Sequence, residues 1–145
     1  VGEAGLFRFV EGKGEPGIVG LHVQQTAHPN TAVIEAWAAD GKTLVMQASS
    51  LGGGRIRICR IDDYPAEITA DAPTLVILQQ DRQGMVSHVT QILAERGINI
   101  AVMRLSRTAR GEIACCVIEV DGELPAGLVE RVAGVPGVLS ARAVR

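Results

Sequence analysis

The sequence is poor in aromatic residues, and its charges of opposite sign nearly cancel. Phe, Trp and Tyr make up 3% of the 145 residues, too few for the stacking platforms that single-stranded nucleic acid needs. There are 14 Lys and Arg against 16 Asp and Glu, and they are dispersed, so no basic stripe predicts nucleic-acid binding. No apolar run approaches the ~20 residues of a membrane-spanning helix. We therefore expect a cytoplasmic protein that binds neither nucleic acid nor a membrane.

Cysteine is scarce as well, with three residues of which two are adjacent. Three cysteines do not make a disulfide framework, and Cys115 and Cys116, as neighbours on a strand, would point to opposite faces. We expect reduced thiols in the core rather than cross-links. No HxH, HExxH or CxxC spacing occurs, so the sequence predicts no metal site.

The first half of the chain, residues 1–68, carries short β-type patterns separated by turns. GLFRFV (5–10) alternates, and EGKGEPG (11–17) is typical of a polar loop. The runs 32–38 and 43–49 flank Asp40-Gly41, a pair that predicts a hairpin. RIRICRI (55–61) predicts a strand whose alternation slips at Cys59-Arg60, which indicates a bulge or a strand end.

After DDYPAEITADAP (62–73) the pattern changes. TLVILQQ (74–80) predicts a short apolar strand, and residues 84–97 predict a helix with one apolar face. The runs 98–107 and 112–120 predict two strands around TARG, residues 124–135 a second helix, and residues 137–145 a final strand. The expected helix faces carry Met85, Val89, Ile92 and Leu93 in the first helix, and Val129, Val132 and Ala133 in the second.

This order of elements, β-α-β-β-α-β, predicts a ferredoxin-like fold with both helices on one face of a single sheet. The fold class is therefore α+β. We expect two domains, a β-rich one over residues 1–68 and the ferredoxin-like one over residues 69–145.

Two glycine features could hold a phosphate. Residues 36–43 match a relaxed Walker pattern, but a β-type run follows in place of the helix whose N-terminus would meet the phosphate. Gly52, Gly53 and Gly54 also precede a strand. We interpret both features as turns, and for the three glycines a backbone nest that binds a carboxylate or another small anion stays open.

A third feature is His28-Pro29-Asn30-Thr31, which predicts a turn with the Asn30 side chain bonded to its own backbone. The alternative is that His28 or Asn30 faces a ligand or another subunit. A catalytic histidine is disfavoured, because no Ser or Cys nucleophile with an orienting acid is apparent.

LVILQQDRQGMVSHVTQILAERGINI (75–100) resembles an ACT domain, the small regulatory module that binds amino acids. It shows a strand, a loop of the D-R-P-G-V type, a helix and G-I-N-I, with Gln83 in place of the usual loop proline. The resemblance implies an effector site between the first loop of one copy and the second strand of another. By position this site carries Gln79, Asp81, Gly84 and Asn99.

The chemistry of these residues fits an amino acid. Amides after Gly84 could meet a carboxylate, and Asp81 could accept from an ammonium group. The alternative is that Asp81 only caps the helix and Asn99 only turns the chain into the strand.

H-P-N-T followed by SSLGGGRIRI (49–58) is similar to the region before the ACT domain in the beta subunit of bacterial iron–sulfur-dependent L-serine dehydratase, with Leu51 where Ile is usual. This resemblance implies that residues 1–68 are the C-terminal part of an allosteric substrate-binding domain. It makes His28, Asn30, Gly52, Gly53 and Gly54 possible ligand or subunit contacts.

The same resemblance implies a partner, the catalytic alpha subunit, which holds a 4Fe-4S cluster and converts L-serine to pyruvate and ammonia in serine catabolism and gluconeogenesis. The present chain would then carry no catalytic residue, metal or cofactor. It would form a homodimer through its ACT domains and bind a small amino-acid effector, with serine favoured.

Two other functions stay open. The regulatory region of a D-3-phosphoglycerate dehydrogenase also joins a substrate-binding domain to an ACT domain, and the chain could instead be a free-standing amino-acid sensor. A dinucleotide-binding G-x-G-x-x-G region upstream would favour the dehydrogenase, and a cysteine-bearing alpha chain would favour the dehydratase.

Overall fold

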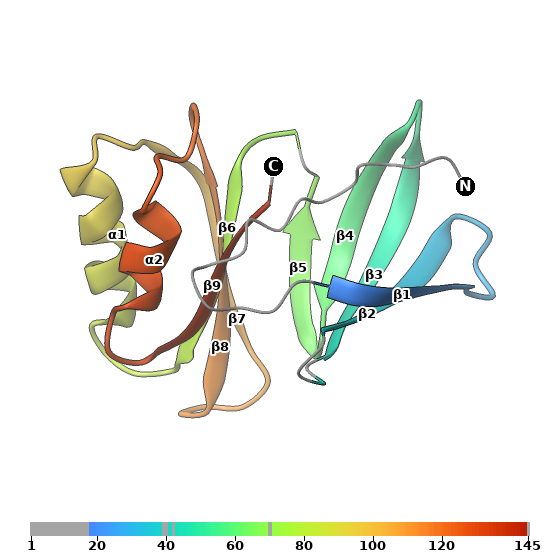
Figure 1. Ribbon diagram of the computed structural model, residues 1–145, viewed down its shortest axis with the longest axis horizontal. Helices are drawn as coiled ribbons and strands as arrows, with labels where there is room; N and C mark the ends of the chain where they lie inside the picture. The colour runs from blue at the N-terminus through green and yellow to red at the C-terminus, as the bar shows by residue number, and fades with distance from the viewer. Residues whose placement is uncertain (1–17, 39–40, 42, 70, 145) are drawn as a thin grey trace. The chain divides into compact units, whose positions relative to one another are not determined.

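The computed structural model describes residues 18–38, 41, 43–69 and 71–144, which belong to two compact units divided between residues 69 and 70 (Figure 1). Each unit is built on one β-sheet. The strand expected at 5–10 and the loop expected at 11–17 lie outside the described residues. The extents of the two domains, 1–68 and 69–145, remain predictions.

The N-terminal unit is an antiparallel meander whose strand order in the sheet is the order in the sequence, β1-β2-β3-β4-β5. One face is apolar and holds the buried side chains of β3, among them Leu44, Met46 and Ala48. The strands are β1 (Ile18–Gln25), β2 (Thr31–Ala38), β3 (Thr43–Gly52), β4 (Arg55–Ile61) and β5 (Tyr64–Ile68).

The hairpin expected around Asp40-Gly41 is present, because β2 and β3 pair in register up to Trp37 opposite Thr43. Gly41 has a φ of 85°, a value that favours glycine. The P-loop alternative is thereby excluded, since Thr43 opens a strand and not a helix.

The slip at Cys59 is a β-bulge. Gln47 pairs with Arg60 and Ala48 with Ile58, so Cys59 is the extra residue of β4. The bulge keeps Ile58 and Ile61 together on the apolar face although three positions separate them, and both are buried. Arg60 therefore points to the opposite, polar face.

The sequence pattern predicts neither β1 nor β5. β5 contains Pro65, which cannot donate to a ladder and argues against a central strand. The strand nevertheless forms because it lies at the edge of the sheet, where a missing amide is tolerated. β1 is also an edge strand, and Gly20 and the polar pair Gln24-Gln25 weaken its signal.

The C-terminal unit has the expected β-α-β-β-α-β order, with sheet order β7-β8-β6-β9 and both helices on one face (Figure 1). The fold class predicted from the sequence is confirmed. Neither described helix is long and apolar enough to cross a membrane. The elements are β6 (Thr74–Gln80), α1 (Met85–Glu95), β7 (Ile100–Arg107), β8 (Ile113–Val120), α2 (Leu128–Ala133) and β9 (Val138–Val144).

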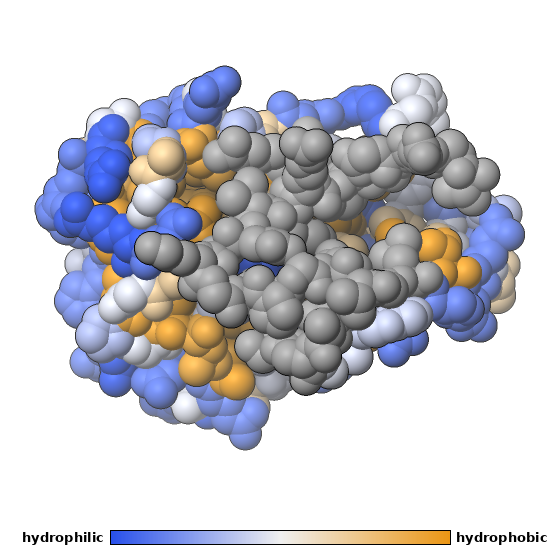
Figure 2. Space-filling view, in the orientation of Figure 1, coloured by the Kyte–Doolittle hydropathy of each residue, from blue (hydrophilic) through white to orange (hydrophobic). Residues whose placement is uncertain are grey.

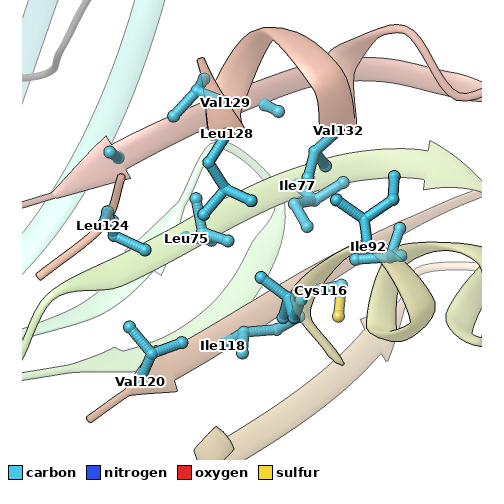
Figure 3. Close-up of a cluster of buried hydrophobic side chains, with 14 residues drawn as sticks. Leu75, Ile77, Ile92, Cys116, Ile118, Val120, Leu124, Leu128, Val129 and Val132 are labelled. Carbon is cyan, nitrogen blue, oxygen red and sulfur yellow. The ribbon is translucent and has the colours of Figure 1, made fainter. Parts of the chain in front are cut away.

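The core of this unit lies between the helices and the sheet (Figure 3). The predicted face of α1 is confirmed, since Met85, Val89, Ile92 and Leu93 are all buried. The predicted face of α2 is wrong at one position. Ala133 is exposed and Leu128 is buried instead, because the short helix begins at Leu128 and turns Leu128, Val129 and Val132 inward.

The two central strands are buried on both faces. In β8 the five residues from Ala114 to Ile118 are all buried, so Cys115 and Cys116 both lie in the interior, as expected. Cys59 differs, because it is only half-buried and its Sγ lies 3.4 Å from Ser49 Oγ on the polar face of the N-terminal unit.

Asp62, at the β4–β5 turn, extends the β3 ladder with its side chain. Its φ is 48°, a left-handed value, and its Oδ1 accepts from Val45 N at 3.0 Å. Its own amide donates to Val45 O at 2.7 Å. The carboxylate therefore satisfies a strand amide at the position where β4 turns away.

We expect Asp62→Ala to lower the free energy of unfolding by about 1–2 kcal/mol. The change removes a hydrogen bond, and it leaves Ala in a left-handed backbone conformation that a short polar side chain tolerates better. Asp62→Asn should lose less, because Asn tolerates this backbone and keeps an acceptor. Asp63→Ala is the matched control, and urea unfolding is the measurement. An equal loss in Asp62→Ala and Asp63→Ala would contradict this role.

Candidate functional site

The loop between β6 and α1, residues 81–84, lies at one end of the C-terminal sheet and leads into an uncapped helix. Gly84 precedes α1 with a φ of 86°, and no side chain caps the helix. The first amides of an α-helix lack intrahelical acceptors, and the helix dipole adds positive charge there. This helix start therefore favours an anionic group.

Asp81 ties this loop to the β7–β8 hairpin. Its Oδ2 accepts from Arg107 Nη1 at 2.6 Å and from Gly111 N at 2.8 Å, and its amide donates to Glu112 O. The expectation that Asp81 caps α1 is wrong, because its carboxylate reaches the hairpin instead. The Asp81 side chain is 17% exposed and that of Arg107 51%.

These contacts lower the pKa of Asp81 below its usual value. The backbone hydrogen bond from Gly111 has the largest effect, and the hydrogen bond from Arg107 adds to it. Both favour the charged carboxylate. At neutral pH the Asp81 carboxylate is therefore an anion that is hydrogen-bonded to the cation Arg107, and the charge of Arg110 also lowers its pKa.

On its other side the loop is tied to the segment that precedes β9. Gln80 N donates to Gly137 O at 2.8 Å, and Arg82 Nη2 donates to Pro136 O at 2.8 Å. A Cβ at Gly137 would lie 2.9 Å from Met85 Sδ, so glycine permits the close approach of α1's first residue. The β6–α1 loop is thus bonded to the β7–β8 hairpin on one side and to the segment before β9 on the other.

Gln79 lies beneath this loop and is 2% exposed. Within the described residues, its Oε1 is a buried side-chain oxygen with no hydrogen-bond partner. Gln79 and Arg107 each pair with Ala114, so their side chains lie on the same face of the sheet, with only a methyl group between them. A buried acceptor without a donor is costly and predicts a ligand or water at this position.

Asn99 does not join this group within one chain. It precedes β7, whereas Arg107 ends it, and eight residues at 3.3 Å each separate the two ends by about 25 Å. Asn99 Nδ2 donates to Asp121 Oδ2 at 2.7 Å, and Asp121 N donates to Asn99 O. The structure therefore brings Gln79, Asp81 and Gly84 to one end of the sheet and Asn99 to the other.

The sequence analysis missed Arg107 and Gly111, the two partners of Asp81. The only signal was the turn-like TARG segment, which contains Gly111. Nothing in the local pattern indicates that this hairpin reaches the β6–α1 loop 26 to 30 residues earlier.

In the N-terminal unit the H-P-N-T turn and the glycine hairpin lie at the same end of the sheet. Thr31 pairs with Ser49, and Ser50 N donates to Asn30 O at 2.7 Å. Gly53 and Gly54 have φ values of 62° and 79°, which suit a two-residue hairpin turn. The glycines therefore turn the chain, as predicted.

The H-P-N-T turn is held differently from the prediction. The turn is held by Thr26 and not by Asn30. Thr26 Oγ1 accepts from His28 N, and its single hydroxyl hydrogen lies between the carbonyl oxygens of His28 and Thr31. The expected bond of the Asn30 side chain to its own backbone is absent from the described contacts. His28 and Asn30 are both exposed.

The three cysteines do not fit an iron–sulfur cluster. The thiolates of a cluster must converge on one group of irons, whereas Cys115 and Cys116 point to opposite faces of β8. Burial raises the pKa of Cys116 to about 11, which keeps it a thiol at neutral pH. Among the described residues, no three His, Cys, Asp or Glu gather to hold a metal ion.

Comparison with known proteins supports the fold of the C-terminal unit. The family model described as AHAS small subunit-like ACT domain matches residues 75–140. Residues 75–140 are therefore similar to an ACT domain in both sequence and fold.

Most of the chain is similar to the beta chains of L-serine dehydratase. The probable beta chain of Bacillus subtilis is 28% identical over 112 residues, which cover 77% of this chain and 50% of that protein. The beta chain of Peptoniphilus asaccharolyticus is 25% identical over 117 residues, covering 81% and 53%.

A second group of relatives is D-3-phosphoglycerate dehydrogenase. The protein of Synechocystis is 30% identical over 96 residues, which cover 66% of this chain and 17% of that protein. The chain thus spans about half the length of the dehydratase beta chains it matches and a smaller share of the dehydrogenase.

The contacts of Asp81 predict a pH-dependent contribution to stability. Because its pKa is lower in the folded state, its contribution is complete above the ordinary value of 3.8 and is lost as the pH falls through the lower folded value. Asp81→Asn should therefore lower the free energy of unfolding at pH 7, and its difference from wild type should narrow below pH 3.8.

Urea unfolding between pH 7 and pH 3 measures this difference. Glu112→Gln, which removes an exposed carboxylate from the same hairpin, is the control and should show no such trend. A difference between Asp81→Asn and wild type that stays constant over this range would contradict the assignment.

Proposed function

We propose that this chain is a regulatory, non-catalytic beta subunit of an L-serine dehydratase, and that its ACT domain binds a small α-amino acid, with L-serine favoured. The related beta chains support the first part. The second part is carried by one observation, the buried Gln79 Oε1 without a donor, which lies next to an acidic residue and an uncapped helix start.

The charges at this end of the sheet suit a zwitterion. The amides at the start of α1 can donate to a carboxylate, which the helix dipole also favours. Gln79 Oε1 and Asp81 can accept from an ammonium group. An α-amino acid carries both groups one carbon apart, so a single ligand would satisfy both.

Asn99 would enter the site from a second copy. β7 is an edge strand, and its side chains Met103 and Leu105 are 43% and 49% exposed. Figure 2 shows hydrophobic residues at the surface of the C-terminal unit, between hydrophilic ones. If two β7 strands pair antiparallel about a two-fold axis, Asn99 of the partner subunit falls beside Arg107, at the Asp81 end. The effector would then stabilise the ACT dimer.

Catalysis would belong to a separate alpha subunit. We assign the 4Fe-4S cluster and the conversion of L-serine to pyruvate and ammonia to that partner, because the cysteines of this chain do not fit the cluster. His28, Asn30 and the hairpin of Gly52, Gly53 and Gly54 are exposed at one end of the N-terminal sheet and are the proposed ligand or subunit contacts there. The assembled enzyme would work in the cytoplasm.

The second candidate function is the regulatory region of a D-3-phosphoglycerate dehydrogenase, which the similarity to the Synechocystis protein favours. The same ACT site would then serve a different catalytic domain. The two candidates differ in the partner and not in the chemistry of the effector.

If this site binds an amino acid, the substitution Gln79→Met should affect stability and ligand binding in opposite ways. Gln79→Met removes the unpartnered oxygen while nearly keeping the volume, so the free protein should be as stable as wild type or more so. The same change should abolish the rise in melting temperature that L-serine produces. Thermal denaturation with and without serine measures both effects.

Gln80→Met, at the exposed neighbouring position, is the control and should keep the response to serine. Asn99→Ala should reduce the response as well, since it removes the contribution of the second copy. A wild-type protein that no amino acid stabilises would rule out the site, and an unchanged response in Gln79→Met would remove Gln79 from it.

The subunit assignment predicts that the full-length protein co-purifies with an L-serine dehydratase alpha chain encoded in the same genome. Pyruvate should form from L-serine only when that alpha chain and its iron–sulfur cluster are present. Pyruvate formation by this chain alone would contradict the non-catalytic role, and stable assembly with a dinucleotide-binding dehydrogenase domain instead would favour the second candidate.

A further inference from the structure

The carboxylate proposed to receive the ligand's ammonium group already has a cation from its own chain. Arg107 Nη1 lies 2.6 Å from Asp81 Oδ2, which is short even for a charge-assisted hydrogen bond. The same oxygen also accepts from Gly111 N at 2.8 Å. An ammonium group that binds Asp81 must therefore compete with Arg107.

We infer that Arg107 competes with the ligand for Asp81: it neutralises Asp81 in the free protein, and a ligand that carries an ammonium group takes its place. This inference rests on the proposed amino-acid site. It predicts that an amino acid displaces Arg107 from Asp81, whereas an acid of the same shape that lacks the ammonium group leaves the ion pair in place.

The positions of the side chains allow this exchange. Arg107 and Gln79 lie in one row across the sheet with Ala114 between them. Ala114 and Gln79 are buried, so Arg107 is the exposed member of this row. The Arg107 side chain is 51% exposed and can turn into solvent. Exposed ion pairs contribute little net free energy, so replacing one cation by another is nearly balanced.

The exchange also links the site to the edge strand. Asp81 is bonded to both ends of the turn between β7 and β8, at Arg107 and at Gly111. Loss of the Arg107 contact would leave the last residue of β7 without its anchor to the β6–α1 loop. The Gly111 amide donates to the same Asp81 oxygen as Arg107, so its resonance should change when the ligand's ammonium group replaces Arg107.

The experiment compares L-serine with L-glycerate, its hydroxy analogue, by calorimetry on the full-length protein. The variants are wild type, Arg107→Gln and the control Arg104→Gln, which removes the same charge from the other face of β7. Nuclear magnetic resonance of the Gly111 amide is the second readout. Melting temperatures check that each variant is folded.

We expect Arg107→Gln to bind L-serine about two- to fivefold more tightly, the range that loss of a competing exposed ion pair allows. L-glycerate should bind it no better than it binds wild type, because an unneutralised Asp81 repels the carboxylate. In wild type, L-serine should shift the Gly111 amide resonance and L-glycerate should not. Arg104→Gln should behave as wild type.

Weaker serine binding by Arg107→Gln would overturn the inference, since Arg107 would then hold the ligand's carboxylate. A Gly111 resonance that serine leaves unchanged in wild type would overturn it as well. In both cases the amino-acid site itself would stand. If neither wild type nor Arg107→Gln binds any amino acid, the proposed site and the inference both fail.

Discussion

The candidate site depends on the hydrogen bonds that the Asp81 carboxylate accepts. It joins the β6–α1 loop to the β7–β8 hairpin through Arg107 and Gly111, and it is the anion at the end of the sheet that an ammonium group would meet. On the other side of the loop, the Gln80 amide donates to Gly137 O and the Arg82 side chain donates to Pro136 O, which holds the helix start in place. Because the loop is bonded on both sides, these contacts set the position of the uncapped amides of α1 relative to the buried Gln79.

A different constraint shapes the N-terminal unit, where one inserted residue sets the faces of a strand. The bulge at Cys59 lets Ile58 and Ile61 both reach the apolar face although an even alternation would separate them. As a result Arg57 and Arg60 both lie on the polar face. The exposed turns that carry His28 and Gly53 lie at one end of this sheet.

Patterns that depend on near neighbours predicted much of this architecture. The spacing of Met85, Val89, Ile92 and Leu93 located α1, and the glycines at 41 and 53 located hairpins, because these features arise within a few residues. Prediction failed where position in the fold decided the outcome. β5 forms despite Pro65 because it lies at an edge, and Ala133 is exposed because α2 begins later than its apolar pattern indicates.

The sequence by itself determined the order of elements and the ACT-type segment that carries Gln79, Asp81 and Gly84, since both are a matter of residue type and spacing. The tertiary structure alone decided what these residues touch. A hydrogen bond joins Asp81 to Arg107, which is 26 residues away in the sequence. The fold buries Gln79 Oε1 without a donor. Asn99 lies at the far end of the sheet because the whole of β7 separates it from Arg107. Such relations come from pairing between distant segments, which local sequence patterns do not encode.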